Sequence, residues 1–223
     1  MIAKTLFAMK NPLAIRTANP KDAGFIAWAI LTATRSHLSK GWFDIALAQP
    51  ESECLHFISM LTTTTVLSQW HYSRFLIAEE GVTPVSAVAA FRAGDAYPVS
   101  TSALVETIKK LELPSKAAEA IWQRGAYMFL CTMRPNDERW VVENLATIPE
   151  RRGCGCTPIL LSRALDNGRN SGFKEAQITL FIGNERAERA YHKVGFLPDK
   201  EKRHPTFEAM TGTAGLRQYR KIL

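Results

Sequence analysis

The sequence predicts a single α/β domain built on a mixed β-sheet. Its C-terminal third alternates strand and helix patterns, and a strand–helix–strand order with one crossover implies a parallel pair of strands. Earlier in the chain, two short apolar runs at 74–79 and 85–91 flank a turn around Gly81, which is typical of an antiparallel pair. A length of 223 residues allows one domain with a substantial core.

The chain before the antiparallel pair reads as one strand and two helical stretches. Residues 13–17 (LAIRT) are expected to form the first strand. Asn19, Pro20 and Asp22 then supply an N-cap, a proline at N1 and an acid at N3, the chemistry of a helix start. A second helical stretch is predicted near 51–69. The first helix is predicted to carry four residues on one face: Phe25, Trp28, Ala29 and Thr32.

Residues 92–139 are long for a connection and are predicted to be a helical insertion before the central strand. Residues 102–113 and 115–123 both look helical and are separated by Pro114. Residues 126–133 (AYMFLCTM) are compatible with a helix or a strand. Helix is favoured because Ala118, Ile121, Trp122, Gly125 and Phe129 recur at helical spacing.

The remaining elements follow in clear alternation. Residues 140–148 (WVVENLATI) are predicted as the central strand, followed by a glycine-rich turn. The elements predicted after this turn are a helix at 158–170, a strand at 176–182, a helix at 184–194 and a strand at 216–222. The predicted domain spans 12–223, including the insertion at 92–139, and 1–11 form an N-terminal extension.

Composition and charge exclude several classes of protein without identifying one. Hydrophobic residues make up 46% and charged residues 22% of the chain, which is ordinary for a globular protein and argues against disorder. The net charge of +7 is dispersed, with its densest patch at 200–204 (KEKRH), so a solvated surface is favoured over a nucleic-acid footprint.

The sequence gives no sign of a membrane, a secretory signal or a metal site. No run of about 18 apolar residues occurs, and the N-terminus lacks a long apolar core with a cleavage site, so a cytoplasmic protein is expected. Cys54 and Cys131 lie far from the Cys154–Cys156 pair in sequence, and no histidine cluster completes a zinc pattern. Reduced thiols are favoured, with a redox switch or a metal site as the alternative.

Residues 145–161 (LATIPERRGCGCTPILL) combine the end of a strand, a glycine-rich turn and the start of an apolar helix. Gly153 and Gly155 permit positive φ and close backbone approach, so several N–H groups can point into one concavity. The helix N-terminus adds partial positive charge, and Arg151 and Arg152 add full charges. Such a turn suits a pyrophosphate, although an ordinary tight connection explains it equally well when it is taken alone.

Residues 184–196 (NERAERAYHKVGF) form a second informative segment. Asn184, Ala187 and Tyr191 recur three and four residues apart and therefore share one helical face. Asn184 is placed to cap the helix, and Gly195 is placed to end it. The alternative interpretation is a capped amphipathic helix whose tyrosine packs in the core.

Together the two segments resemble the GNAT superfamily of acetyl-CoA-dependent N-acetyltransferases. The family's turn motif Arg/Gln-x-x-Gly-x-Gly/Ala is similar to the run from Arg152 to Thr157. The resemblance covers 140–196 well and 13–91 loosely. The family's later motif Asn-x-x-Ala-x-x-x-Tyr-x-x-x-Gly-Phe is matched by Asn184, Ala187, Tyr191, Gly195 and Phe196.

One departure from the family pattern is Thr157, where the family usually has Gly or Ala. We expect Thr157 to act as the N-cap of the next helix and Pro158 as its first residue. The branched side chain of Thr157 is expected to crowd the phosphate side of the turn.

The resemblance implies an enzyme that uses acetyl-CoA as co-substrate, without a metal, to acetylate a primary amine of a small molecule or peptide. It implies neither a nucleic-acid nor a membrane partner and leaves a homodimer open. The alternative is a non-catalytic acyl-CoA-binding sensor or regulatory module of the same fold. The cofactor-binding residues that it implies are Leu145, Ala146, Thr147, Arg152, Gly153, Cys154, Gly155, Cys156, Thr157, Pro158, Asn184 and Ala187.

The resemblance also implies two proton-transfer roles. Tyr191 occupies the position of the family's usual proton donor to the departing thiolate. Glu143, on the predicted central strand, is the best candidate by position for the base that deprotonates the amine. Strand alternation could equally point Glu143 away from the site, because a bulge in this strand would change the phase, and a structural carboxylate is the open alternative.

Overall fold

A computed structural model describes residues 12–133 and 136–223, so the predicted extension at 1–11 lies outside the described residues. The described part contains one seven-stranded sheet in the order β1-β2-β3-β4-β5-β7-β6. Its β4 and β5 are parallel and its other neighbouring strands antiparallel, which confirms the predicted mixed sheet. The strands are β1 (Leu13–Thr17), β2 (Phe75–Glu80), β3 (Thr83–Arg92), β4 (Arg139–Thr147), β5 (Glu175–Phe181), β6 (Leu197–Arg203) and β7 (Gly215–Ile222).

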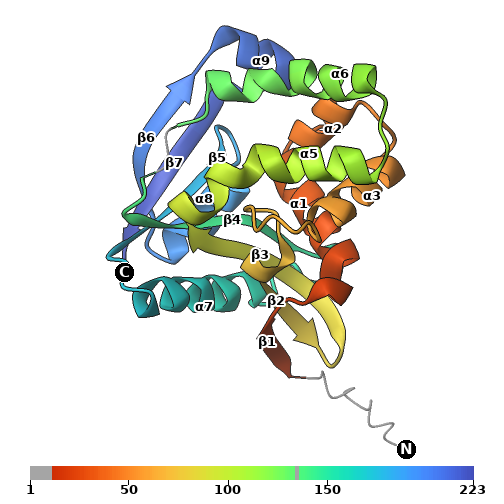
Figure 1. Ribbon diagram of the computed structural model, residues 1–223. Coiled ribbons are helices and arrows are strands. Elements are labelled where there is room, and N and C mark those ends of the chain that lie inside the picture. The colour runs from red at the N-terminus through yellow and green to blue at the C-terminus, as the bar shows by residue number, and fades with distance from the viewer. Residues whose placement is uncertain (1–11, 134–135) are drawn as a thin grey trace, which may run out of the picture.

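Helices cover both faces of this sheet (Figure 1). On one face, α7 and α8 pack over a core that includes Val142 and Ile178. On the other face, α1 lies against β3 and β4, and α3 and α5 are stacked outside it. The helices are α1 (Ala23–Arg35), α2 (Trp42–Leu47), α3 (Glu51–Leu61), α4 (Ala93–Ala96), α5 (Ser100–Lys110), α6 (Ser115–Gly125), α7 (Cys156–Asn170), α8 (Glu185–Lys193) and α9 (Pro205–Thr211).

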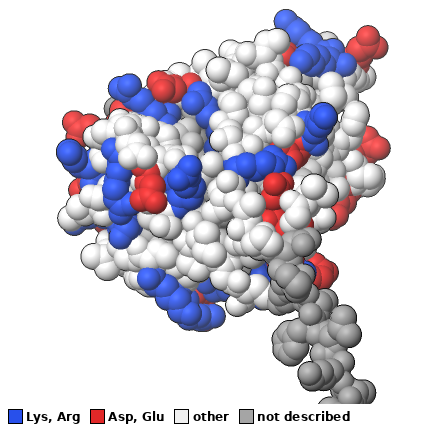
Figure 2. All heavy atoms as spheres, turned by 90° about the horizontal axis from the view of Figure 1, so that it is seen from below, with Lys and Arg blue, Asp and Glu red and all other residues white. Residues whose placement is uncertain are grey.

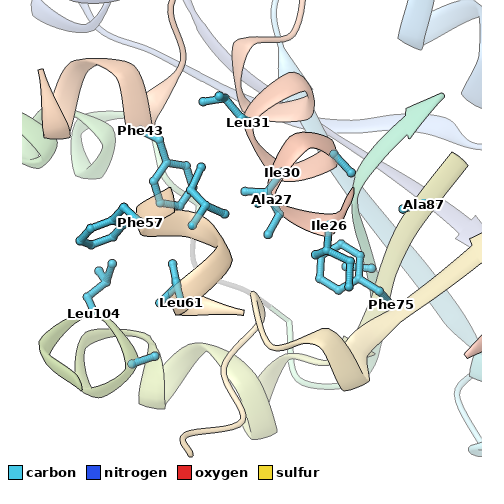
Figure 3. Close-up of a cluster of buried hydrophobic side chains, with 14 of the residues drawn as sticks. Ile26, Ala27, Ile30, Leu31, Phe43, Phe57, Leu61, Phe75, Ala87 and Leu104 are labelled. Carbon is cyan, nitrogen blue, oxygen red and sulfur yellow. The ribbon is translucent and has the colours of Figure 1, made fainter. Parts of the chain in front are cut away.

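The described part of the segment at 92–139 is largely helical, as predicted, and contributes to the main core. Its helices α5 and α6 are followed by a 3-10 turn, η4 (Ala126–Leu130). Leu104 of α5 lies beside Phe57 and Leu61 of α3 (Figure 3). Ile121 of α6 belongs to the same buried cluster. The segment is therefore a packed layer of the domain, and its removal would expose the core.

The start of the first helix follows the predicted chemistry. Asn19 accepts a hydrogen bond from Lys21 N at 3.0 Å, and Asp22 accepts one from Asn19 N at 2.8 Å. The first turn is a 3-10 helix, η1 (Pro20–Asp22), which runs into α1.

On the predicted face of α1, Ala29 is buried, and Phe25 and Trp28 pack against the same core while remaining partly exposed. Thr32, the fourth residue of that face, is partly buried. The helix packs against both the sheet and α3, so its buried arc is wide and is set by two neighbours. The buried residues are Ile26, Ala27, Ala29, Ile30 and Leu31.

Other differences concern short or polar elements. The second helical stretch ends at Leu61 rather than near residue 69, and α2 was not predicted because six residues show too little periodicity. The β6 strand was missed because all seven of its residues are exposed, so it has no apolar alternation.

On the face of the molecule shown in Figure 2, Lys and Arg lie in several separate groups with acids between them. Among the described residues, no helix has the length and apolar character needed to cross a membrane.

Candidate active site

A cleft opens where the two parallel strands separate. Pairing between β4 and β5 is limited to Arg139–Val141 against Glu175–Gln177. Beyond these residues the strands diverge, and a cavity of about 460 Å³ lies between them. Its walls come from both strands, the C-terminal end of α1, the turn before α7, and the first turns of α8.

A β-bulge in β4 reverses the alternation of side chains at this cleft. Ala87 of β3 pairs with Ala146 and Ala89 pairs with Glu143, so one β3 residue faces two residues of β4. Asn144 sits in the bulge with φ of 53°, a left-handed conformation. As a result, Val141 and Ala146 share the core under α1. On the opposite face, Val142 and Leu145 belong to the core under α7 and α8.

Glu143 lies in the cleft just before this bulge. Its Oε2 accepts a hydrogen bond of 2.9 Å from the Tyr97 hydroxyl, and its Oε1 accepts one of 3.1 Å from Asn144 Nδ2. Burial raises the pKa of Glu143 to about 7, while the two hydrogen bonds oppose the rise. A carboxyl group with this pKa can take up and release a proton near neutral pH.

Tyr191 lines the same cleft from α8. Its side chain is buried, and its ring meets that of Phe196 edge-on with centroids 6.1 Å apart. Burial raises the pKa of Tyr191 above the ordinary value of a phenol. The hydroxyl therefore keeps its proton at neutral pH and is available as a donor.

The glycine-rich turn forms the rim of the cleft at the N-terminus of α7. Gly153 has φ of 80° and Gly155 has φ of 86°, and a Cβ added at either would meet no heavy atom within 4 Å. The N–H groups in the first turn of an α-helix have no partner within the helix. The turn is thus open on the side where an anion would approach these groups.

The expected capping role of Thr157 was wrong. The helix begins at Cys156, and its N-cap is Gly155. Because Gly155 can adopt a left-handed conformation, the helix starts earlier than predicted, and Thr157 lies inside its first turn. The Thr157 hydroxyl is 3.4 Å from that of Thr147 on β4.

The two arginines of the turn play different structural roles. Arg152 lines the cleft, and its Nε donates to the Thr147 carbonyl oxygen at 3.2 Å. Arg151 forms an ion pair with Glu80 at 2.7 Å and is outside the cleft lining. The expectation that both side chains add positive charge to the turn therefore holds for Arg152, whereas the charge of Arg151 is balanced by Glu80.

Asn184 joins two walls of the cleft. Its Oδ1 accepts from Ala187 N at 3.1 Å, which caps α8 as predicted. Its Nδ2 donates to Ser36 Oγ at 2.6 Å. Ser36 follows α1 with φ of 60° and ψ of −119°, a strained conformation for a residue with a side chain. The side chain of Asn184 thus ties the end of α1 to the start of α8.

Most of the predicted site residues meet in this cleft. Cys154 and Pro158 are exposed outside its lining, Gly155 is partly buried beside it, and Cys156 is buried beneath the turn. The predicted residues that line the cleft are Glu143, Leu145, Ala146, Thr147, Arg152, Gly153, Thr157, Asn184, Ala187 and Tyr191.

Several lining residues had no signal in the sequence. They come from elements far apart in the chain, so no spacing links them. These lining residues include Thr32, Thr34, Ser36, Trp42, Met128, Phe181, Arg186 and Leu216.

Known proteins resemble this chain at the level of family and fold. A family model described as the acetyltransferase (GNAT) family matches residues 45–196. A search of curated proteins found no match. An acetyltransferase crystal structure has 17% identity and a TM-score of 0.69, with 94% of this chain and 98% of that chain covered. An N-acetyltransferase from Staphylococcus aureus Mu50 has 19% identity and a TM-score of 0.69, with 94% and 100% covered.

A third solved structure contains the acetyl donor. It is a putative acetyltransferase from Salmonella typhimurium with its cofactor acetyl-CoA, at 16% identity and a TM-score of 0.53, with 96% of this chain and 95% of that chain covered. At these identities the solved structures establish the fold. Because the family model also spans more than half of the sequence, the chain belongs to the acetyltransferase (GNAT) family.

Proposed function

We propose that this protein transfers an acetyl group from acetyl-CoA directly to a primary amine. The observation that carries the proposal is the placement of Glu143 and Tyr191 in one cleft between β4 and β5. Glu143 follows Val141 and Val142 in strict alternation, so its side chain is on the α1 face of the sheet. Tyr191 belongs to the core on the α7 and α8 face. A base and an acid thus approach the cleft from opposite sides.

The residues present fit the anionic end of acetyl-CoA. Gly153 leaves open space beside the N-terminus of α7, and Arg152 adds a positive charge to the lining. Helix N-termini and backbone N–H groups bind phosphate well. We assign the pyrophosphate to this turn, from Gly153 to Pro158, with Pro158 contributing position only because it has no N–H.

The central part of the cleft fits an extended amide chain. Beyond Val141, β4 has no pairing with β5 among the described residues. This edge can pair with the pantetheine arm as it would with an added strand, and a β4 N–H in the stretch Leu145–Thr147 can stabilise charge that develops on the thioester oxygen. Bound acetyl-CoA would supply an activated acetyl group at this point.

Glu143 and Tyr191 carry the two proton movements of the proposal. An alkylamine with a pKa near ~10.4 is protonated at neutral pH, so it must lose a proton before it attacks. Glu143 accepts that proton, the amine nitrogen bonds to the acetyl carbon, and the carbon–sulfur bond breaks. Tyr191 donates its proton to the departing thiolate, and the second proton that the nitrogen loses as the amide forms returns to the Tyr191 oxygen. The products are an N-acetylated amine and CoA thiol, and one proton passes to water for each ammonium consumed.

An acetyl-transfer assay with a Glu143→Gln variant tests the proposal. We expect acetyl-CoA-dependent thiol release and acetylated amine from the wild type, and a rate lower by about 10²–10⁴-fold in Glu143→Gln with unchanged acetyl-CoA affinity. Glu138→Gln is the matched control, because Glu138 is exposed and outside the cleft lining. Acetyl-CoA binding without turnover of any amine would contradict the proposal and favour a binding module.

A further inference from the structure

The cleft has a second side, whose lining differs from that of the glycine-rich turn at Gly153–Pro158. We call this turn the phosphate turn, after the group that we assign to it. Phe181 of β5 and Leu216 of β7 belong to a buried cluster beneath η4 and α9, and Trp42 of α2 and Met128 of η4 pack against the same cluster. All four residues also line the cleft. We call Trp42, Met128, Phe181 and Leu216 the apolar wall.

Glu143 and the apolar wall lie on the same face of the sheet. Tyr97 reaches Glu143 from the helical segment that also supplies Met128. The turn before α7, with Arg152, belongs to the other face, as does Arg186 in the first turn of α8. An amine that reaches Glu143 from the side away from the phosphate turn therefore passes along the apolar wall.

The apolar wall is held rigidly. Trp42 Nε1 donates to the Gly125 carbonyl oxygen at 3.0 Å, so the polar atom of the indole is already paired. Its ring stacks on Trp70 with centroids 6.3 Å apart. A Cβ at Gly125 would come within 2.9 Å of the Trp42 ring, which shows how closely α6 approaches it. Trp42 thus presents a fixed aromatic surface with no free polar atom.

The charges of the cleft restrict the acceptor further. Glu143 is the sole acidic residue among the described residues that line it. The proposed reaction uses this carboxylate at the reacting nitrogen, so a second ammonium group of the acceptor would have no partner. A buried charge without a partner is strongly disfavoured. The cleft is therefore suited to one amine on an apolar body.

We propose that the acceptor is a primary monoamine with an apolar, arylalkyl-type body, which packs against the apolar wall and places its nitrogen at Glu143. This inference rests on the proposed acetyl transfer and specifies its substrate class. The acetyl group moves from the thioester sulfur to this nitrogen, Glu143 takes the amine proton, and the thiolate is protonated as above. The wall disfavours diamines and amino acids, because a second ammonium group or a carboxylate would be buried against apolar side chains without a charged partner.

A matched panel of three amines tests the inference. 2-Phenylethylamine has the ring and one amine, phenylalanine adds a carboxylate to the same ring, and putrescine replaces the ring by a second ammonium. We expect kcat/KM for 2-phenylethylamine to exceed that of the other two by at least ~10-fold. A preference for putrescine or phenylalanine would overturn the inference and leave acetyl transfer intact. No turnover of any amine would overturn both.

A Met128→Glu variant tests the role of the wall itself. It places a carboxylate on the apolar wall, so kcat/KM for 2-phenylethylamine should fall at least ~10-fold, chiefly through KM, and that for putrescine should rise. The control is Phe129→Glu, since Phe129 is 75% exposed in the same turn and is outside the lining. Calorimetry with acetyl-CoA verifies that each variant is folded. Unchanged selectivity in a folded Met128→Glu protein would overturn the assignment, and the wild-type panel decides alone if this variant does not fold.

Discussion

The hydroxyl of Tyr97 donates a hydrogen bond of 2.9 Å to Glu143 Oε2 and joins the helical segment before β4 to the centre of the cleft. The Tyr97 ring is fixed edge-on against Phe91, with centroids 5.4 Å apart. Burial and the nearby Glu143 charge both raise the pKa of Tyr97, so its hydroxyl remains a donor. The bond lowers the pKa of Glu143 and opposes the larger effect of burial. Tyr97 is therefore a positioning residue for the proposed base.

Tyr97→Phe should move the pH dependence of acetyl transfer. Without the hydrogen bond, the pKa of Glu143 rises further above about 7, so the acid limb of kcat/KM shifts to higher pH, on the order of one unit. The rate at high pH should change little because Glu143 is still present. Tyr72→Phe, a half-buried tyrosine outside the cleft lining, is the control. A profile that coincides with that of the wild type would show that Tyr97 does not influence the base.

Glu143→Gln should change the pH dependence of stability. The folded-state pKa of about 7 lies above the ordinary 4.5, so the ionised carboxylate is disfavoured in the folded protein. The contribution of Glu143 to stability is complete below pH 4.5 and is lost as the pH rises through 7. By pH 8 the loss is on the order of 3 kcal/mol.

Urea unfolding of the wild type and Glu143→Gln at pH 5 and pH 8 measures this effect. Between pH 5 and pH 8, the unfolding free energy of the wild type should fall by up to about 3 kcal/mol relative to that of the variant. Glu138→Gln, at an exposed position, is the matched control. A difference that is constant with pH would mean that Glu143 titrates near its ordinary value in the folded protein.

Tyr191→Phe should slow the chemical step and leave acetyl-CoA affinity nearly unchanged. The substitution keeps the ring that packs against Phe196 and removes only the proposed proton donor. Single-turnover rates should fall by about 10²–10⁴-fold, and they are the proper measurement because product release can limit kcat. Equal single-turnover rates across pH 6–9 would identify Tyr191 as a core tyrosine.

Gly153→Asp should weaken acetyl-CoA binding by at least ~2 kcal/mol, because it adds a carboxylate beside the proposed phosphate position. Gly212→Asp separates this effect from backbone strain. Gly212 has φ of 82°, and an added Cβ there would also meet nothing within 4 Å, but it is at the end of α9, outside the cleft lining. Equal acetyl-CoA affinities for the two folded variants in calorimetry would place the phosphates elsewhere.

The parts of the fold that were predicted correctly have strong local patterns. The antiparallel pair β2 and β3, the strands β4 and β5 and the helices α7 and α8 all follow from apolar periodicity and turn residues. The β6 strand lacks such a pattern because it is an exposed edge, and it exists through its pairing with β7. The full buried arc of α1 could not be predicted from one helical face, because two neighbouring layers, rather than one, determine which side chains are buried.

The sequence by itself determined the family and the glycine-rich turn, because these depend on residues close together in the chain. Gly153 and Gly155 permit the turn locally, and Asn184 and Tyr191 share a helix, so their spacing carries the information. Only the tertiary structure decided which face of the sheet Glu143 occupies, because it shows Val141, two residues earlier, packed under α1. The bulge at Asn144 then places Ala146 on this same face. The tertiary structure also decided what surrounds Glu143: Tyr97 is 46 positions away, and the apolar wall combines four elements. Long-range packing of this kind leaves no periodic trace in the sequence.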